Sequence, residues 1–367
     1  MSRGFSIYLD LVRFLAAILV LLSHFAYPRF TDGDYLTIRT LNLGSDAVVV
    51  FFVLSGLVIA SAAERDGSAG RFAFRRATRL LSVAAPALAI TLLFDSFGAW
   101  LNPAAYDGWW YNAVEAWEVL LYGLSFSNEW SFAAIRLGTN GPFWSLSYEA
   151  GYYLLFGAAI FTSGWRRVAL LAGLALLVGS RILLLMPVWV FGVLVWRVIA
   201  AGRGADTSRR LSLALAIGCP VVYAVALAVG LPGMLMDLTQ TLATHYQVYP
   251  TLRFSDEFLW NTLIGALVAY QFIGMVPLLA QATFGRLGIS IRWLAGASFS
   301  IYVIHYPALQ LVDAALPETL PLRHLVLLAS VLAICFLFAQ LFERRLSDMR
   351  RAVIRMVTRP VQAPARR

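Results

Sequence analysis

Arg13 and His24 lie within one apolar segment, residues 9–27, that is long enough to cross a bilayer as a helix. An ionisable side chain in such a helix is costly, and it usually faces a cavity, a partner or a reacting group. The two residues are eleven positions apart, which is about 20° beyond three full helical turns and about 16 Å along the axis. They therefore point the same way near the two ends of the predicted helix, a geometry suited to a long ligand lying between the two faces of a bilayer.

Two further apolar segments carry a residue able to do chemistry. The string GPFWSLSYEAGYYLLF places Glu149 about a turn and a half after Trp144, too deep for a charge at the membrane surface. A buried carboxylate needs a partner, so Glu149 could orient a histidine, hold a substrate hydroxyl or pair with an arginine. The string WLAGASFSIYVIHYPALQLV places His305 inside another span. His305 could form a hydrogen bond to a neighbouring helix, or it could assist His24.

A dense arginine cluster, RFAFRRATRLL, follows the second apolar segment in what we predict to be an inner loop. Within it, Arg76 and Arg79 are spaced i, i+3 and would share one helical face. Paired guanidinium groups bind phosphates through forked hydrogen bonds, but arginines on the inner side also act as an ordinary topology signal. The preceding string VVVFFVLSGLVIA contains Ser55 and Gly56, which favour close packing of helices.

The elements that must position these residues are membrane helices. Hydrophobic residues make up 60% of the 367 residues and charged residues only 13%, too few to cover a soluble domain of this length. The net charge of +9 does not indicate nucleic acid binding, because the basic residues lie in short runs between apolar stretches. Cys219 and Cys335 lack metal-ligand spacing, so the sequence indicates neither a disulfide framework nor a metal site. We therefore predict an all-α polytopic membrane protein.

Hydropathy predicts about ten transmembrane helices. They cover about residues 8–28, 44–62, 80–100, 141–161, 167–180, 186–200, 211–231, 257–280, 293–313 and 322–342. Only residues 179–185, which include Arg181, separate spans five and six, so a kinked pair or a partial insertion is an alternative there. With a cytoplasmic N-terminus, 22 arginines fall in inner segments and 6 in outer segments. The positive-inside rule therefore places both termini in the cytoplasm, with a membrane domain over residues 1–343 and a basic cytoplasmic tail over residues 344–367.

The two longest outer loops are rich in acidic and aromatic residues. Residues 101–140 include Trp109, Trp110 and Trp117. Such rings prefer the membrane interface, so part of this loop is expected to lie along the surface as a short amphipathic helix, with stacking on sugar rings as the alternative. Residues 232–257 form the second predicted outer loop, which ends in Asp256 and Glu257.

Five strings occur in an order and spacing that resemble the membrane acyltransferase family three, bacterial O-acyltransferases of surface polysaccharides and other carbohydrates. They are DLVRFLAAILVLLSHF, GSDAVVVFFVLSG, RRATR, FWSLSYEAGYYL and GASFSIYVIHYP, and they extend from Asp10 to about Glu343. The resemblance implies transfer of an acyl group, usually acetyl from cytoplasmic acetyl-CoA, to a sugar hydroxyl on the outer side. It implies O-acetylation in a bacterial cell envelope by a multi-pass protein of the inner (cytoplasmic) membrane.

The resemblance also implies roles for individual residues. Arg13 and His24 match the family's motif of an arginine, ten residues and a histidine, with His24 as the catalytic candidate. Arg76 and Arg79 match paired arginines implicated in acyl-CoA engagement. Glu149 matches the glutamate of the fourth-span motif and is the second catalytic candidate, while Arg13, Arg76 and Arg79 are the candidates for donor binding. Supporting roles are expected for the polar and aromatic residues of the same strings: Asp10, Ser55, Trp144, Ser145, Tyr153 and His305.

A neutral imidazole at His24 could take the proton from a sugar hydroxyl as the oxygen attacks the thioester carbonyl. The ordinary pKa of about 6.5 leaves much of the ring neutral at physiological pH. A covalent acyl-histidine is the alternative, and the sequence does not separate the two.

No tightly bound cofactor is expected, since acetyl-CoA or another acyl-CoA would be the donor substrate. The expected partners are acyl-CoA, membrane lipid and a carbohydrate acceptor, either a surface polysaccharide, a lipid-linked glycan or a secreted glycan, with no nucleic acid. A proton-coupled transporter or flippase of a polysaccharide precursor would also carry ionisable residues in its spans. The two halves of the sequence show no repeat of the kind found in many carriers.

Overall fold

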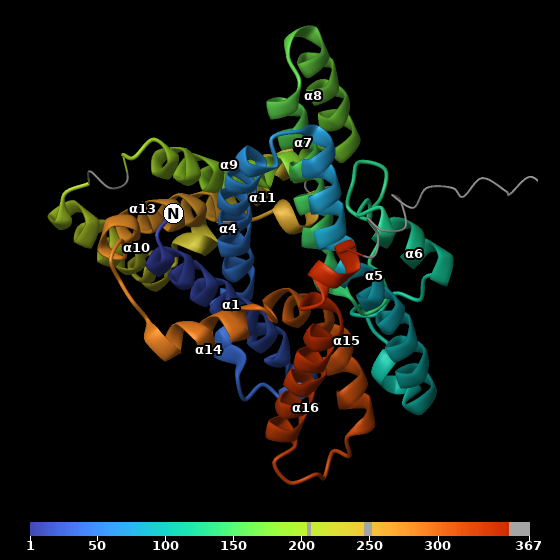
Figure 1. Ribbon diagram of the computed structural model, residues 1–367. Coiled ribbons are helices and arrows are strands. Elements are labelled where there is room, and N and C mark those ends of the chain that lie inside the picture. Colours follow the sequence, from blue (N-terminus) through green and yellow to red (C-terminus); the bar gives the residue numbers. More distant parts are fainter. Residues whose placement is uncertain (204–206, 246–251, 352–367) are drawn as a thin grey trace, which may run out of the picture.

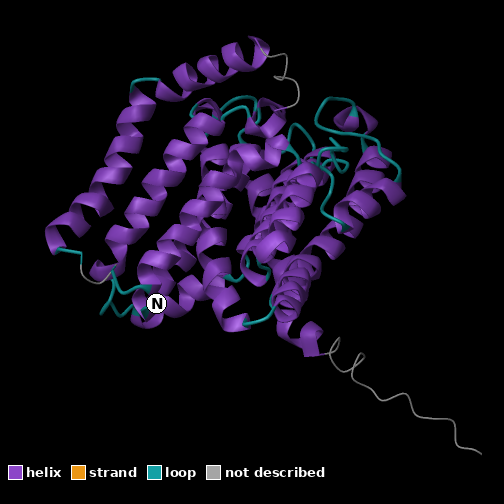
Figure 2. Cartoon of the chain, turned by 90° about the horizontal axis from the view of Figure 1, so that it is seen from above, coloured by secondary structure: helices purple, strands orange, loops and turns teal. Residues whose placement is uncertain are grey.

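The computed structural model describes residues 1–203, 207–245 and 252–351, and most of these residues lie in helices. Within these ranges the only β-type pairing is an isolated bridge between Leu137 and Asn140. Figure 2 shows helices lying side by side with loops at their ends. The predicted all-α architecture is confirmed. Most of the predicted basic tail, residues 352–367, lies outside the described residues.

Ten of the helices coincide with the ten predicted spans. They are α1 (Arg3–Phe25), α4 (Leu43–Asp66), α5 (Ala69–Leu101), α7 (Trp144–Phe161), α8 (Gly164–Val178), α9 (Ser180–Ala200), α10 (Arg209–Ala228), α13 (Phe258–Leu278), α15 (Ser298–Ala315) and α16 (Arg323–Phe338). Shorter elements connect them: α2 (Pro28–Thr31), α3 (Leu36–Thr40), η1 (Pro103–Tyr106), α6 (Ala116–Leu124), η2 (Gly141–Phe143), α11 (Leu231–His245), η3 (Arg253–Ser255), α14 (Gly285–Ala295) and η4 (Ala339–Glu343).

Seven helices of the described chain are long and apolar enough to cross a membrane, or eight if the bent pair α14 and α15 is one span. This number is smaller than the predicted ten because α7 and α8 do not meet the same test, and α15 meets it only together with α14. α8 has only 15 residues, and α7 carries Ser145, Ser147 and Glu149 in its first turns. Gly179, whose positive φ of 87° ends α8, separates spans five and six, and α9 begins at the next residue.

Most of the segment predicted as an inner loop between the second and third spans is helical. α4 ends at Asp66, its C-cap Gly67 adopts a positive φ, and α5 then begins at Ala69 and continues through all the clustered arginines. Arg76 and Arg79 therefore lie on one helix, as their spacing predicts. Arginine and alanine favour helix, and this stretch contains no residue that would stop one. The arginine cluster therefore lies on a helix that extends beyond the apolar segment, and each guanidinium has a fixed direction.

The second predicted outer loop also contains an unexpected helix, α11, over Leu231–His245. Pro232 stands near its start, where a missing backbone N–H costs nothing, and apolar residues recur at Leu235, Leu238 and Leu242. The helix predicted in the other outer loop is present as α6, which exposes Trp117 and Leu121.

α4 lies between α1 and α9 and packs closely on both (Figure 1). An ideal Cβ built on Gly56 would lie 2.0 Å from the carbonyl oxygen of Trp189, and one on Gly192 would lie 2.0 Å from that of Val53. The two glycines thus let the backbones of α4 and α9 touch, as small residues do between membrane helices. The predicted close packing at Gly56 is confirmed.

α1 and α15 contact each other and carry the residues central to the site. The bend between α14 and α15, 45°, leaves the carbonyl of Ala295 outside the regular helical pattern. Arg13 of α1 donates a hydrogen bond to this carbonyl over 3.1 Å, and Ser298 donates to it over 2.8 Å. The bend therefore gives Arg13 a fixed partner in the middle of the bundle.

We expect α5 to have its N-terminal end in the cytoplasm. Ala69, the first residue of this helix, and Ala104, beyond its other end, are both exposed, whereas the native Cys219 and Cys335 are buried. A cysteine at Ala104 should react with a membrane-impermeant thiol reagent in intact cells, and one at Ala69 should react only after lysis, because arginine bias places the start of α5 inside. Labelling of Ala69→Cys but not Ala104→Cys in intact cells would invert the predicted orientation.

Candidate active site

His24 and His305 lie in contact although they are 281 positions apart. Nδ1 of His24 is 3.1 Å from Nε2 of His305, and the two ring centroids are 5.0 Å apart. His305 is fully buried, whereas His24 is partly exposed. The sequence suggested two roles for His305, a hydrogen bond to a neighbouring helix or assistance to His24. In the structure its position allows both, because the neighbouring residue is His24 itself.

The hydrogen bonds of this pair set the position of each proton. Nδ1 of His305 lies 2.8 Å from the carbonyl oxygen of Ile301, so this nitrogen donates and Nε2 of the neutral ring accepts. Nδ1 of His24 lies between two acceptors, the carbonyl oxygen of Val20 at 2.9 Å and Nε2 of His305. In the neutral state this nitrogen must therefore carry the proton. Nε2 of His24 keeps a free lone pair and forms no hydrogen bond with any described residue.

Two tyrosines flank the His24 ring. The centroid of Tyr306 lies 5.0 Å from it in an edge-on arrangement, and that of Tyr27 lies 5.9 Å from it. The Tyr306 hydroxyl accepts a hydrogen bond from Arg29 over 3.0 Å. These contacts hold the imidazole in one orientation, which a base must have to take a proton from a bound substrate.

Glu149 lies in α7 and faces α4 and α9. Its Oε1 accepts hydrogen bonds from Ser55, over 2.6 Å, and from Tyr153. Trp189 of α9 donates to the Ser55 oxygen over 3.2 Å. Among the described residues Glu149 contacts neither a histidine nor an arginine, so two of its three predicted partners are not found. Its Oε2 forms no hydrogen bond in the described chain, which leaves an acceptor available for a substrate hydroxyl or water.

The first residues of α7 contact several other segments of the chain. The ring of Trp144 stacks on Phe254, with centroids 4.5 Å apart. Ser145 lies 2.6 Å from the hydroxyl of Tyr302, which also donates to the carbonyl of Pro142 over 3.1 Å. The Tyr302 ring is 6.3 Å from that of His305. Ser145 thus reaches the histidine pair through Tyr302, whereas Trp144 acts mainly in packing.

Arg13, halfway along α1, and Arg79 of α5 lie within electrostatic range of each other. Arg13 pairs with Asp10 over 3.1 Å and interacts electrostatically with Arg79 and Glu343. Arg79 lies 3.4 Å from Glu343, a buried carboxylate that also accepts hydrogen bonds from the backbone and hydroxyl of Ser300. Two of the three predicted donor-binding arginines therefore share one neighbourhood, and the predicted supporting residue Asp10 lies beside them.

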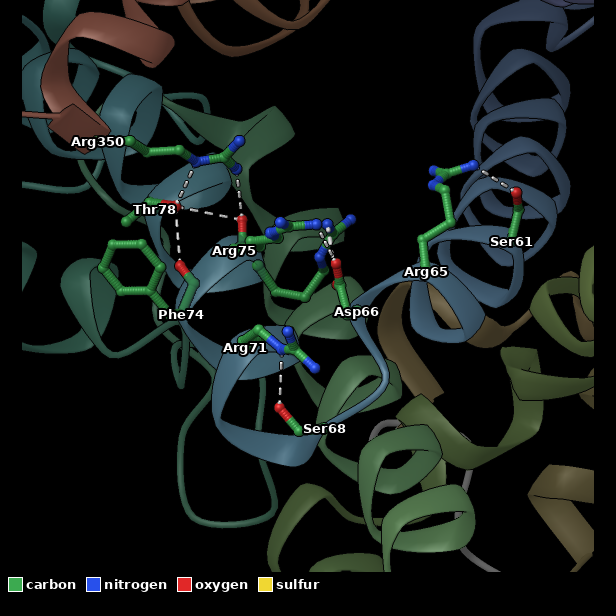
Figure 3. Close-up of polar contacts among 10 residues, drawn as sticks. Ser61, Arg65, Asp66, Ser68, Arg71, Phe74, Arg75, Thr78 and Arg350 are labelled. Carbon is green, nitrogen blue, oxygen red and sulfur yellow. Dashed lines mark hydrogen bonds and ion pairs between the residues drawn. The ribbon is translucent and has the colours of Figure 1, made fainter. Parts of the chain in front are cut away.

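Two other arginines of the cluster, Arg75 and Arg76, lie near Asp66 at the end of α4. Asp66 is buried and pairs with Arg75, and Arg76 lies 3.7 Å from it (Figure 3). Arg350 donates to the Thr78 hydroxyl and to the carbonyl of Arg75, so the start of the predicted tail packs against α5. Arg76 is mostly buried, with a side-chain exposure of 15%, and its Nε has no hydrogen-bond partner in the described chain.

Some members of this polar set are in direct contact. Arg79 pairs with Glu343, Tyr153 donates to Glu149, and His305 lies against both His24 and the Tyr302 ring. The other neighbours, Arg76 with Tyr153 and Glu149 with Tyr302, lie within electrostatic range of each other without a hydrogen bond.

Sequence reasoning missed three members of this site: Glu343, Tyr302 and Asp66. Tyr302 stands within the string GASFSIYVIHYP, and Glu343 is the acidic residue at the end of the last span. An acidic side chain at a span end, near a candidate arginine cluster, is a signal that could have found Glu343 and Asp66.

A buried carboxylate, Glu129, fastens the long outer loop to the bundle. It lies 3.4 Å from Arg181 of α9 and 3.2 Å from Arg253 of η3. Burial raises the pKa of Glu129 to about 7, although both arginines oppose this shift. The Arg181 that interrupts spans five and six in the sequence therefore serves as an anchor for this loop.

The sequence also resembles known proteins. The family model Acyl_transf_3, described as an acyltransferase domain, matches residues 6–340. An acyltransferase, MdmB, of Streptomyces mycarofaciens is 31% identical over 151 residues, which is 40% of this chain and 36% of the relative. An O-acetyl transferase of Shigella phage Sf6 is 28% identical over 152 residues, 41% of this chain and 45% of the relative. The matched part is thus less than half of each relative's length, and no solved structure gives a significant match.

Proposed function

Because the chain belongs to the Acyl_transf_3 family of acyltransferases, we propose that it transfers an acyl group from cytoplasmic acyl-CoA to a hydroxyl of a carbohydrate outside the membrane. Acetyl is the acyl group we favour, since the relative from Shigella phage Sf6 is named an O-acetyl transferase. The acceptor would be a surface polysaccharide, a lipid-linked glycan or a secreted glycan, and the protein would lie in the inner membrane of a bacterium.

One observation carries this proposal. The partly exposed His24 keeps a free lone pair on Nε2, and Arg13 stands eleven positions earlier on the same helix, within electrostatic range of Arg79. A base and guanidinium groups set apart in this way suit a donor that has phosphates at one end and a thioester at the other.

The reaction can be written with His24 as general base. Nε2 takes the proton from the acceptor hydroxyl as its oxygen attacks the thioester carbonyl, and the tetrahedral intermediate then expels the sulfur of CoA. The thiolate takes the proton back from the imidazolium, so His24 returns to its neutral form. His305 accepts the Nδ1–H of His24, which stabilises the imidazolium while it exists and keeps Nε2 directed at the substrate.

The same nitrogen could attack the thioester itself and form an acyl-histidine that the sugar hydroxyl then cleaves. The arrangement of Nδ1 and Nε2 serves both routes. Glu149, held by Ser55 and Tyr153, would bind a hydroxyl of the substrate or a water through its remaining oxygen and so line the path of the donor.

At the inner side, Arg13, Arg76 and Arg79 would bind the phosphates of acyl-CoA. Arginine is suited to this role because its planar fork matches phosphate oxygens. When no acyl-CoA is bound, each guanidinium group lies near a carboxylate: Arg13 near Asp10, Arg76 near Asp66 and Arg79 near Glu343.

The test uses purified protein in nanodiscs with acetyl-CoA and extracted envelope glycans. Release of free thiol that depends on both substrates, together with acetylated sugar by mass spectrometry, is the expected result. The rival transporter predicts sugar flux across proteoliposomes without thiol release, and the family match favours the acyltransferase over it. Flux without thiol release from any acyl-CoA would overturn the proposal.

A further inference from the structure

The outer arginines divide into two groups. Arg181, Arg253 and Arg323 each pair with a carboxylate of the chain. Arg29, Arg39 and Arg136 have no carboxylate within 4.0 Å in the described residues, and each is partly exposed. A guanidinium without a charged partner next to a reaction site is available for an anionic ligand.

The three unpaired arginines come from three separate segments and gather around one tyrosine. All three interact electrostatically with the Tyr27 hydroxyl. Arg39 of α3 lies 4.0 Å from the centroid of the Tyr27 ring and donates to the Ser23 hydroxyl. Arg39 also interacts electrostatically with His24, the candidate base.

An exposed tryptophan completes this surface. The Trp109 side chain is 65% exposed, and its ring centroid is 6.0 Å from that of Tyr27. The guanidinium carbon of Arg136 lies 5.4 Å from the centroid of the Trp109 ring. Exposed aromatic faces beside hydrogen-bond donors suit the stacking of sugar rings. We call the surface formed by Tyr27, Arg39, Trp109 and Arg136 the arginine–aromatic site.

Arg136 also lines a polar cavity of about 360 Å³. Its other lining residues are Ser45, Trp144, Arg253, Phe254, Asp256 and Glu257. Two arginines and two carboxylates thus offer this cavity both donors and acceptors, which suit the hydroxyls of sugar units next to the acidic group.

We propose that the arginine–aromatic site binds the acceptor and selects carbohydrates that carry a carboxylate or a phosphate on, or next to, the sugar that is acylated. This inference rests on the proposed function, since it places the acceptor beside His24. Arg39 and Arg136 form charge-assisted hydrogen bonds to the acidic group, and Trp109 stacks on the ring.

The test measures equilibrium binding without donor, so it does not depend on catalysis. Protein in nanodiscs is titrated with three oligosaccharides of equal length that end in glucuronic acid, in glucose 6-phosphate or in glucose. The wild type should bind one or both acidic probes about tenfold more tightly than the neutral one, since a charge-assisted hydrogen bond contributes about 1.4 kcal/mol or more. The acidic probe that binds better identifies the group as carboxylate or phosphate.

Arg39→Gln and Arg136→Gln should each abolish this preference of about tenfold for acidic probes. Trp109→Ala should weaken binding of all three probes. Trp117→Ala is the matched control, because Trp117 is exposed to 60% on the neighbouring helix α6 and should leave every affinity unchanged. Equal or undetectable binding of the acidic probes by wild type would overturn the inference, as would arginine variants that weaken all probes in proportion.

The outcomes separate this inference from the proposed function. Thiol release from acetyl-CoA with extracted glycans tests the transfer reaction, whereas the affinity ratio tests the acceptor site. Transfer without any preference for acidic probes leaves the acyltransferase standing and removes the arginine–aromatic site from acceptor selection.

Discussion

His24→Ala should lower acyl transfer by roughly 10²–10⁴-fold, the usual contribution of a single general base, while the protein remains in the membrane at the wild-type level. The physical reason is the loss of the Nε2 lone pair, which no neighbouring group replaces. His305 cannot substitute for it, because its ring is fully buried and is held on α15 by the hydrogen bond from its Nδ1 to the carbonyl of Ile301. The measurement is the rate of thiol release and sugar acylation in nanodiscs at equal protein concentration.

His24→Asn provides the matched control for this variant. The asparagine amide can donate to the Val20 carbonyl and to His305 as Nδ1–H does, so it keeps the hydrogen bonds of the pair while it lacks a base. We expect the same loss of activity as in His24→Ala with a thermal stability closer to wild type. Near-wild-type turnover in His24→Asn would remove His24 from the catalytic role and reduce the pair to a structural contact.

Much of the membrane architecture could be predicted from sequence, because hydropathy reports directly how a segment transfers into lipid. The ten predicted segments each fall on a helix, and the cost of an ionisable residue in lipid pointed to His24, Glu149 and His305. Hydropathy does not reveal that α5 begins at Ala69, before the apolar segment, or that α11 lies in the second predicted outer loop, because both stretches have polar or mixed composition.

The partners within the site could not be predicted. Hydropathy says that a buried charge needs a partner, but it does not say which helix supplies it. Glu343 meets Arg79 across 264 positions, and His305 meets His24 across 281. Those contacts depend on the order and tilt of the helices, which are set by packing such as the close approach of Gly56 and Trp189.

The outer arginines illustrate the same limit. In the sequence, Arg29, Arg39 and Arg136 enter only a count of charges outside the membrane. The fold gives them different roles from Arg181 and Arg253, because the latter meet Glu129 while the former surround Tyr27. The sign of a loop's charge is therefore a property of the sequence, but whether a charge is free to bind a ligand is a property of the fold.

In the arginine cluster of α5, Arg79→Lys should raise the KM for acetyl-CoA by about tenfold or more, although it conserves the charge. Lysine keeps an ion pair with Glu343 and satisfies the positive-inside rule, but it loses the planar fork that matches two phosphate oxygens. Arg79→Gln should impair donor use further, and its loss of charge beside a buried carboxylate should also lower thermal stability. The measurement is thiol release against donor concentration for both variants.

Arg71→Lys and Arg71→Gln are the matched controls, because Arg71 lies on the same helix, is exposed and bonds only to the neighbouring Ser68. Both should keep the wild-type KM. If Arg79 served only to neutralise Glu343, Arg79→Lys would behave as wild type while Arg79→Gln would lose stability without a specific change in KM. Normal donor affinity in both Arg79 variants would therefore assign this arginine to the fold and move phosphate binding to Arg13 and Arg76, which keep their own carboxylate partners in Asp10 and Asp66.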